Sequence, residues 1–209
     1  MPGKRIRAGN RRRDKNMVYI LRHGQTSTNQ ANRLQGRSDN PLNENGIRQA
    51  DMTAAWFREQ GIVFDVIYSS PLKRAVDTGK IVAGDIPVIL DDRLIEMDYG
   101  PYEGMDLRHP APEIVTFFSD FVNNPAPDGM EPLSSVAKRA GRFMEDIKAE
   151  IEGKTVLIST HAIAMKGILE SLTPGSEGRY WSTYIGNCAV YKTDVVHGSY
   201  SIPQEQLME

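Results

Sequence analysis

The chain has 209 residues, 40% of them hydrophobic and 25% charged, and its formal net charge is −2. This composition is typical of a globular domain and excludes collagen-like, coiled-coil and largely disordered chains, and no apolar run approaches the ~20 residues of a membrane-spanning helix. The single cysteine, Cys188, excludes an internal disulfide and any metal site built from several cysteines, and it favours a cytoplasmic protein.

The first 16 residues carry a different charge from the rest of the chain. They contain seven basic residues and one acidic residue, so residues 17–209 are net acidic. The segment has no aromatic residue and no hydrophobic period, and the apolar run after it is too short for a secretory signal. We predict that residues 1–16 form a disordered or extraneous tail, with a nucleic-acid-binding or lipid-binding arm as the alternative. Residues 17–209 are predicted to form a single domain.

Predicted strands alternate with predicted helices from Met17 onward. Short apolar runs predict strands at 18–21, 66–68, 87–90, 155–158 and 187–196. Apolar residues at helical spacing predict helices at 45–60, 72–83, 112–122, 134–151 and 162–172. The helix at 72–83 is expected to have Ser70 as its N-cap and Pro71 as its first residue.

The alternation of strands and helices predicts an α/β fold. We expect a three-layer sandwich in which helices flank a mainly parallel central sheet. The segment 91–133 breaks the alternation and is rich in Pro, Gly and Asp. It is predicted to form a small cap excursion over one edge of the sheet.

Cationic and imidazole side chains stand where predicted strands end. Arg22 and His23 follow the first strand, and His161 follows the fourth. Arg74 lies at the start of the helix after the second strand, where a cation is disfavoured by about 0.3–1 kcal/mol unless an anion binds there. Ligands of open α/β sheets bind at the carboxyl ends of the strands, so these four side chains together predict an anion site. Taken singly, Arg74 could be a solvated arginine and His23 a histidine bonded to a loop carbonyl, whereas Arg22 at the end of a buried strand must meet a counter-charge.

Four blocks of the sequence, in order, form a recognisable pattern. They are Leu21-Arg22-His23-Gly24-Gln25-Thr26 with Asn29, Gln35-Gly36 and Pro41–Gly46; Ser69–Thr78; Leu94–Gly100 with Glu103-Gly104; and Ile158-Ser159-Thr160-His161. This pattern resembles the histidine phosphatase superfamily, also called the phosphoglycerate mutase-like family, and covers the chain from Met17 to about Leu172. The resemblance implies the phosphoglycerate mutase-like version of the α/β fold.

The resemblance also implies a role for each matching residue. His23 is implied to be the nucleophile that takes up the phosphoryl group, since a neutral imidazole with one free ring nitrogen can attack phosphorus. Arg22, Arg74 and His161 are implied to hold the phosphoryl oxygens. Further substrate contacts are implied for Asn29, Gln35 and the backbone N–H of Ala162, which stands where the family usually has glycine. Glu96 is implied to be the general acid, with Asp98, Glu103 and Glu131 as the alternatives. No metal and no cofactor are implied.

The resulting hypothesis is a metal-independent hydrolase of small phosphomonoesters that works through a phosphohistidine. A phosphoglycerate mutase is the alternative within the family, and an inactive phospholigand-binding protein is the alternative outside enzymes. The short stretch between Gly104 and Gly129 favours the phosphatase, because mutases of the family carry a longer excursion. We expect no membrane partner and no nucleic-acid partner for the domain, and the sequence leaves the oligomeric state and the substrate open.

Other notable side chains are given mostly structural interpretations. The residues that could line the entrance of the site are Tyr99, Tyr102, Met105, Arg108, Phe117 and Phe118. The aromatic pairs Trp56-Phe57 and Phe117-Phe118, together with Cys188, are expected to pack in the core or the cap. His109 and His197 match no block and are expected to lie on the surface or in loops.

Overall fold

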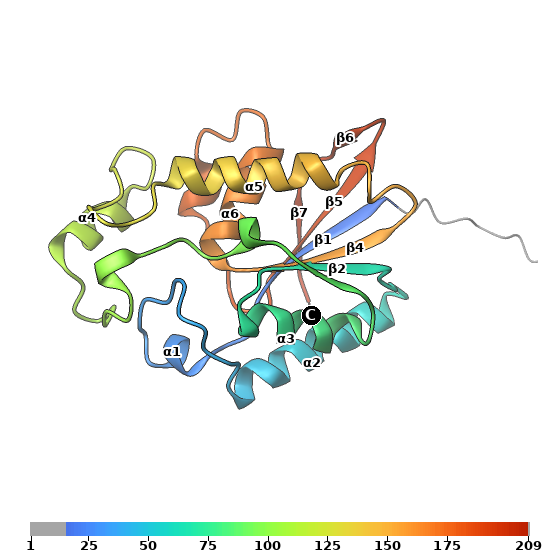
Figure 1. Cartoon of the computed structure of the whole chain (residues 1–209), viewed down its shortest axis with the longest axis horizontal. Coiled ribbons are helices and arrows are strands. Elements are labelled where there is room, and N and C mark those ends of the chain that lie inside the picture. Colours follow the sequence, from blue (N-terminus) through green and yellow to red (C-terminus); the bar gives the residue numbers. More distant parts are fainter. Residues whose placement is uncertain (1–15, 209) are drawn as a thin grey trace, which may run out of the picture.

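The computed structural model describes residues 16–208, so the prediction for the basic tail lies outside the described residues except at Asn16. A central sheet lies between two layers of helices (Figure 1). The predicted α/β class is therefore confirmed.

The sheet has the strand order β3-β2-β4-β1-β5-β6, and β7 pairs with β5. Its strands are β1 (Met17–Arg22), β2 (Val66–Ser69), β3 (Val88–Leu90), β4 (Thr155–Thr160), β5 (Val190–Val196), β6 (Ser199–Tyr200) and β7 (Gln204–Gln206). Strands β1 to β4 pair in parallel, whereas β5 runs antiparallel to β1. The mainly parallel sheet that the sequence predicts is thus extended by an antiparallel C-terminal part.

The last long strand begins later than predicted, at Val190 instead of Asn187. Cys188 has a left-handed φ of 57°, which interrupts the extended backbone. The Asn187 side-chain amide instead donates to the His23 carbonyl oxygen at 3.0 Å. These two residues form a loop that contacts the end of β1.

The helices are α1 (Ser27–Gln30), α2 (Glu44–Glu59), α3 (Lys73–Ala83), α4 (Pro112–Ser119), α5 (Leu133–Ile147) and α6 (Ala162–Leu172). Short 3-10 helices are η1 (Asp92–Leu94), η2 (Gly100–Tyr102) and η3 (Arg179–Ser182). Helix α4 ends before the predicted Val122, because the Asp120 carboxylate accepts the N–H groups of Val122 and Asn123 and turns the chain.

The two faces of the sheet are covered by different helices. Along β1, Val18 and Ile20 pack in the cluster that contains the α5 and α6 side chains, while Tyr19 and Leu21 pack in the cluster of α2 and α3. This alternation follows from the two-residue period of a strand. Figure 1 shows α2 and α3 on one side of the sheet and α5 and α6 on the other. Burial on both faces explains why β1 and β4 are continuous apolar runs.

The cap excursion lies beyond the carboxyl ends of the parallel strands (Figure 1). A third apolar cluster joins it to the first turns of α5 and α6, through Met97, Ile114, Phe117, Ile163 and Trp181 among others. Because Phe117 is buried in this cluster, it does not line an entrance, which corrects one of the two sequence interpretations of that residue. The cap is therefore packed onto the helix ends that border the strand termini.

Candidate active site

The carboxyl ends of β1 and β4 bring two histidines together. These strands are neighbours, with Arg22 in register with Thr160, and the next residue of each chain segment is a histidine. The ring centroids of His23 and His161 lie 5.1 Å apart at an interplanar angle of 60°. Both side chains are buried, with 3% and 0% exposure. His23 and His161 are 138 positions apart in the sequence. They lie in one site because each follows the last residue of one of two neighbouring parallel strands.

The protonation of His23 follows from its hydrogen bonds. Its Nδ1 lies 2.7 Å from the Gly24 carbonyl oxygen, and a carbonyl only accepts, so Nδ1 carries the proton. Nε2 then presents a lone pair, towards which the Arg74 Nε–H points at 3.3 Å. Burial, with the nearby Arg22 and Arg74 charges, holds the pKa of His23 well below its ordinary value. A neutral imidazole with an available Nε2 is the state that a nucleophile requires.

A further contact, which sequence reasoning missed, orients the His23 ring. The Gly24 N–H donates to the Thr78 hydroxyl at 3.0 Å, and that hydroxyl donates to the Arg74 carbonyl at 2.7 Å. Helix α3 thereby fixes Gly24, the residue whose carbonyl oxygen accepts the Nδ1 proton. A threonine in the middle of a helical pattern gives no sequence signal for this role.

Arg74 is fully buried, with 0% exposure, and its guanidinium is aimed by two backbone carbonyls. Nη1 donates to Ser38 O at 2.7 Å and Nη2 donates to Gly36 O at 2.6 Å. Burial lowers its pKa to about 10, so the group stays cationic at neutral pH. Position 36 requires glycine, because a Cβ there would lie 2.6 Å from the Met97 carbonyl oxygen.

The predicted N-cap of α3 is wrong. The helix begins at Lys73, and Leu72 precedes it without any side-chain cap. Ser70 is instead turned towards His161, with its Oγ 2.8 Å from Nε2. The same hydroxyl accepts the Leu72 N–H at 3.3 Å, so its single proton is free to point at Nε2. In that arrangement Nε2 accepts the hydroxyl proton, and the His161 proton lies on Nδ1.

Three buried side-chain nitrogens have no hydrogen-bond partner within residues 16–208, and all three belong to predicted site residues: Arg22 Nε, Gln35 Nε2 and His161 Nδ1. The Gln35 Oε1 accepts the Thr26 hydroxyl at 2.8 Å, which leaves its Nε2 as the free donor. Arg22 is held by a 2.6 Å bond from Nη1 to Ile185 O. Leaving a buried donor unpaired costs about 1–3 kcal/mol. The unpaired donors include a nitrogen of the second imidazole and one of Arg22, whose charge acts on both histidines, and such donors are suited to a bound anion.

Asn29 and Ala162 also offer donors near these groups. Asn29 Oδ1 accepts the Thr26 N–H at 3.2 Å in the cap of α1, so its amide nitrogen is the group that can donate to a ligand. Ala162 is the first residue of α6, so its N–H has no acceptor within the helix. An alanine in place of glycine keeps this backbone donor.

Glu96 is buried against the beginning of α6. Its Oε1 accepts the N–H groups of Met97 at 2.9 Å and Ala164 at 3.0 Å, and its Oε2 accepts that of Ile163 at 3.2 Å. These helix amides follow His161 directly in the chain, so the carboxylate and the second histidine share one helix end. Glu96 and Arg22 also act on each other electrostatically.

The three alternative acids are occupied elsewhere. Glu103 accepts the N–H groups of residues 36–38 and thereby shapes the loop that holds Arg74. Glu131 binds Arg139 at 2.8 Å, and although burial raises its pKa, this partner lowers it below the ordinary value overall. Asp98 is half-exposed and lies 3.6 Å from Arg37. Glu96 is the acid that adjoins the histidines.

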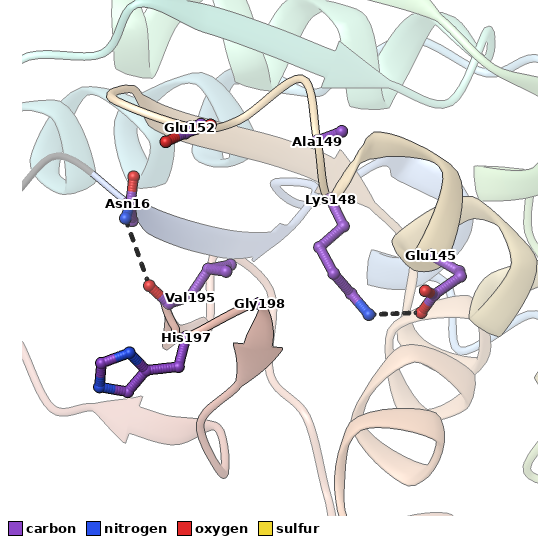
Figure 2. A pocket seen from close by; sticks show the side chains of 8 residues that line it. All are labelled: Asn16, Glu145, Lys148, Ala149, Glu152, Val195, His197 and Gly198. Atoms are coloured by element: carbon purple, nitrogen blue, oxygen red, sulfur yellow. Dashed lines mark hydrogen bonds and ion pairs between the residues drawn. The ribbon is translucent and has the colours of Figure 1, made fainter.

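The remaining histidines lie apart from this site. His109 is exposed beside Asp106. His197 lines a cavity of about 510 Å³ near the start of β1, at the opposite end of the sheet from His23. Figure 2 shows its ring directed away from the ion pair of Glu145 and Lys148 in that cavity. Cys188 is buried, as predicted.

Two further observations concern residues 16–208 only. They contain no group of three or more His, Cys, Asp or Glu side chains arranged to hold a metal ion. None of their helices combines the length and apolar character needed to cross a bilayer.

The chain is similar to known proteins along most of its length. The family model of the histidine phosphatase superfamily (branch 1) matches residues 18–204. Phosphoserine phosphatase 1 of Hydrogenobacter thermophilus is 32% identical over 170 residues, which span 79% of this chain and 80% of that protein. A probable phosphoglycerate mutase GpmB of Yersinia pestis is 32% identical over 183 residues, which span 85% of this chain and 84% of that protein.

Solved structures share the fold. The phosphoserine phosphatase from Entamoeba histolytica in complex with 3-phosphoglyceric acid has a TM-score of 0.80 at 27% identity, with 92% of this chain and 98% of that chain covered. A mutant of the phosphatase from the same organism, in complex with phosphoserine, has a TM-score of 0.78 at 27% identity, with 90% and 95% covered.

Proposed function

The chain belongs to the histidine phosphatase superfamily, and on this basis we propose that it hydrolyses small phosphomonoesters through a phosphohistidine on His23. The observation that carries the proposal is the set of unpaired buried donors on Arg22, Gln35 and His161, together with the unprotonated Nε2 of His23, which accepts the Arg74 Nε–H. A phosphoryl group supplies acceptors for all of these donors and an electrophile for that nitrogen.

The first half of the reaction transfers the phosphoryl group to the enzyme. His23 Nε2 attacks phosphorus, an N–P bond forms and the ester P–O bond breaks. Glu96, beside the first turn of α6, enters this step in its protonated form and gives that proton to the leaving oxygen. The Nδ1–H bond to Gly24 O stabilises the positive charge that develops on the ring. Arg22, Arg74 and His161 bind the phosphoryl oxygens, where charge accumulates.

The second half releases phosphate. Glu96 takes a proton from a water molecule as the water oxygen attacks phosphorus, and the N–P bond breaks. Nε2 recovers its lone pair and inorganic phosphate leaves, so both Glu96 and His23 return to their starting states. The bonds and protons balance over the two steps.

Trapping the intermediate tests this proposal. The full chain is mixed with radiolabelled p-nitrophenyl phosphate and quenched, and the label is followed through acid and alkali. We expect acid-labile, alkali-stable label on the wild type and on the matched variant His197→Ala, and none on His23→Ala. Label that persists in His23→Ala would contradict the assignment.

A phosphoglycerate mutase is the second candidate, because a relative with 32% identity carries that name. A mutase returns the phosphoryl group to its bound intermediate, whereas a phosphatase loses it to water. Assays with 3-phosphoglycerate, with and without a bisphosphoglycerate primer, separate the two. Isomerisation that depends on the primer and exceeds phosphate release would favour the mutase.

The cytoplasmic location is a further proposal, supported by the single buried cysteine. Fractionation of the source cells, followed by detection of the protein, tests it.

A further inference from the structure

Glu96, the acid of the proposed mechanism, lies on a segment without regular secondary structure. The 3-10 helix η1 ends two residues before it, and η2 begins at Gly100. Residues 95–99 belong to no helix and to no strand, so no ladder of backbone hydrogen bonds holds them. A general acid must nevertheless stand within hydrogen-bond reach of the oxygen that it protonates. Side chains from other elements must therefore fix this segment.

The Arg139 side chain of α5 fixes the segment on one side of Glu96. Its Nη1 donates to the carbonyl oxygens of Arg93 at 2.8 Å and Ile95 at 2.5 Å. Ile95 directly precedes Glu96 in the chain, so the second bond holds the peptide group that joins these two residues. One guanidinium thus fixes both η1 and the backbone that leads into the acid.

Glu131 holds this guanidinium and also the other side of the segment. Its carboxylate accepts Arg139 Nε–H at 2.8 Å and Nη2–H at 3.1 Å, which makes a bidentate pair. The same carboxylate accepts the Asp98 N–H at 3.2 Å, and the Glu131 N–H donates to the Asp98 carbonyl oxygen at 2.8 Å. The two side chains are only 15% and 10% exposed, so water screens the pair little. Together they hold the backbone before and after Glu96.

The pair stands on elements that also carry the second histidine. Helix α5 packs against α6 in one apolar cluster, and α6 begins directly after His161. Thr160, the residue before that histidine, donates to the Leu94 carbonyl oxygen at 2.7 Å. The phosphoryl-binding residues Arg22 and Arg74 belong to β1 and α3 instead. Loosening the pair should therefore displace the acid and leave these two guanidiniums in place.

We propose that Arg139, held by Glu131, is a positioning residue that sets where Glu96 delivers its proton. This inference rests on the proposed function and adds a residue to its mechanism. The guanidinium makes four hydrogen bonds, to one carboxylate and two carbonyl groups. A lysine has a single nitrogen, which cannot reproduce this fork. A misplacement of the acid by about 1 Å can cost about a hundredfold in rate.

The leaving group distinguishes a misplaced acid from other defects. The alkoxide of glycerol phosphate needs a proton as its ester bond breaks, whereas the nitrophenolate of p-nitrophenyl phosphate leaves readily without one. The ratio kcat/KM covers only the steps up to the phosphohistidine, so the later role of Glu96 as a base does not enter it. We expect Arg139→Lys to lower kcat/KM about tenfold to a hundredfold for glycerol phosphate and less than about threefold for p-nitrophenyl phosphate.

The matched control is Arg142→Lys, which makes the same change at an exposed position of α5 and should alter neither value. Glu131→Gln keeps the shape of the partner and removes its charge, so it should show the same selective loss to a smaller extent. Thermal melting monitors the fold of each variant. If Arg139→Lys does not fold, Glu131→Gln decides the inference.

A double variant gives a readout that a merely structural role would not produce. Misplacing the acid matters only where the acid is present, so Arg139→Lys should cost glycerol phosphate hydrolysis nothing further in a Glu96→Gln background. If Arg139 served only the fold or the phosphoryl group, the two losses would multiply.

Several outcomes would overturn the inference. They are equal losses for the two esters in Arg139→Lys, unchanged kinetics, and losses that multiply in the double variant. If Glu96→Gln by itself affects both esters equally, Glu96 is not the acid and the inference falls with that assignment. A wild type that hydrolyses neither ester contradicts the proposed function instead.

Discussion

Removing the Ser70 hydroxyl is the sharpest test of how His161 is set for phosphate binding. The hydroxyl lies 2.8 Å from His161 Nε2 and accepts the Leu72 N–H at 3.3 Å. Ser70→Ala leaves both buried groups unpaired, which should lower the free energy of unfolding by about 1–3 kcal/mol. The proton of His161 is then no longer directed to Nδ1, so the imidazole donates to phosphate in only part of the molecules.

We expect Ser70→Ala to lower kcat/KM by about tenfold to a hundredfold, which is less than the loss of a whole transition-state donor. Steady-state kinetics measures this loss, and nitrogen NMR of the imidazole reports which ring nitrogen of His161 is protonated. Ser69→Ala is the matched control, because Ser69 is equally buried and its hydroxyl donates to the Ser70 carbonyl at 2.8 Å without reaching His161. If the two variants lose activity to the same extent, or the protonated nitrogen is unchanged in Ser70→Ala, the reasoning is refuted.

Three further predictions concern other parts of the site. Glu96→Gln should lower kcat by about a hundredfold and change phosphate affinity by less than about threefold, and parallel losses in kinetics and calorimetry would assign the acid elsewhere. Burial and nearby arginines hold the pKa values of His23 and His161 well below 6.5. Unfolding therefore takes up protons below that pH, so stability should fall as pH drops from 7 to 5, by up to about 1.4 kcal/mol per pH unit for each histidine, and less steeply in His23→Ala. Gly36→Ala should displace the loop that holds Arg74, since the new Cβ would lie 2.6 Å from a carbonyl oxygen, and should raise KM in steady-state assays.

The local sequence predicts the central elements because their burial is nearly complete. The apolar residues of β1 and β4 are buried on both faces, so their runs were recognisable, and the side chains after them necessarily stand at one edge of the sheet. The three-residue β7 and the two-residue β6 carry no comparable period. Their pairing with β5 depends on tertiary contacts that a local pattern does not contain.

The sequence does not predict roles that depend on where a side chain points. A serine followed by proline is typical of a helix start, yet Ser70 hydrogen-bonds to a histidine 91 positions away. Lys166 is the one basic residue of a mostly apolar helix, and a sequence pattern does not tell a solvated lysine from a buried one. The resemblance to a family indicated His23, Arg74 and Gln35, but only the folded structure shows that the Gln35 amide nitrogen has no partner.

Helix α6 connects the parts of the proposed reaction. His161 precedes it, and the Glu96 carboxylate accepts amides of its first turn. The helix packs against α5 and the apolar cluster of the cap, so its orientation is fixed before any ligand binds. A rigid helix therefore sets the spacing between the second histidine and the acid. This spacing should therefore limit how far the leaving oxygen can stand from the phosphoryl donors when Glu96 protonates it.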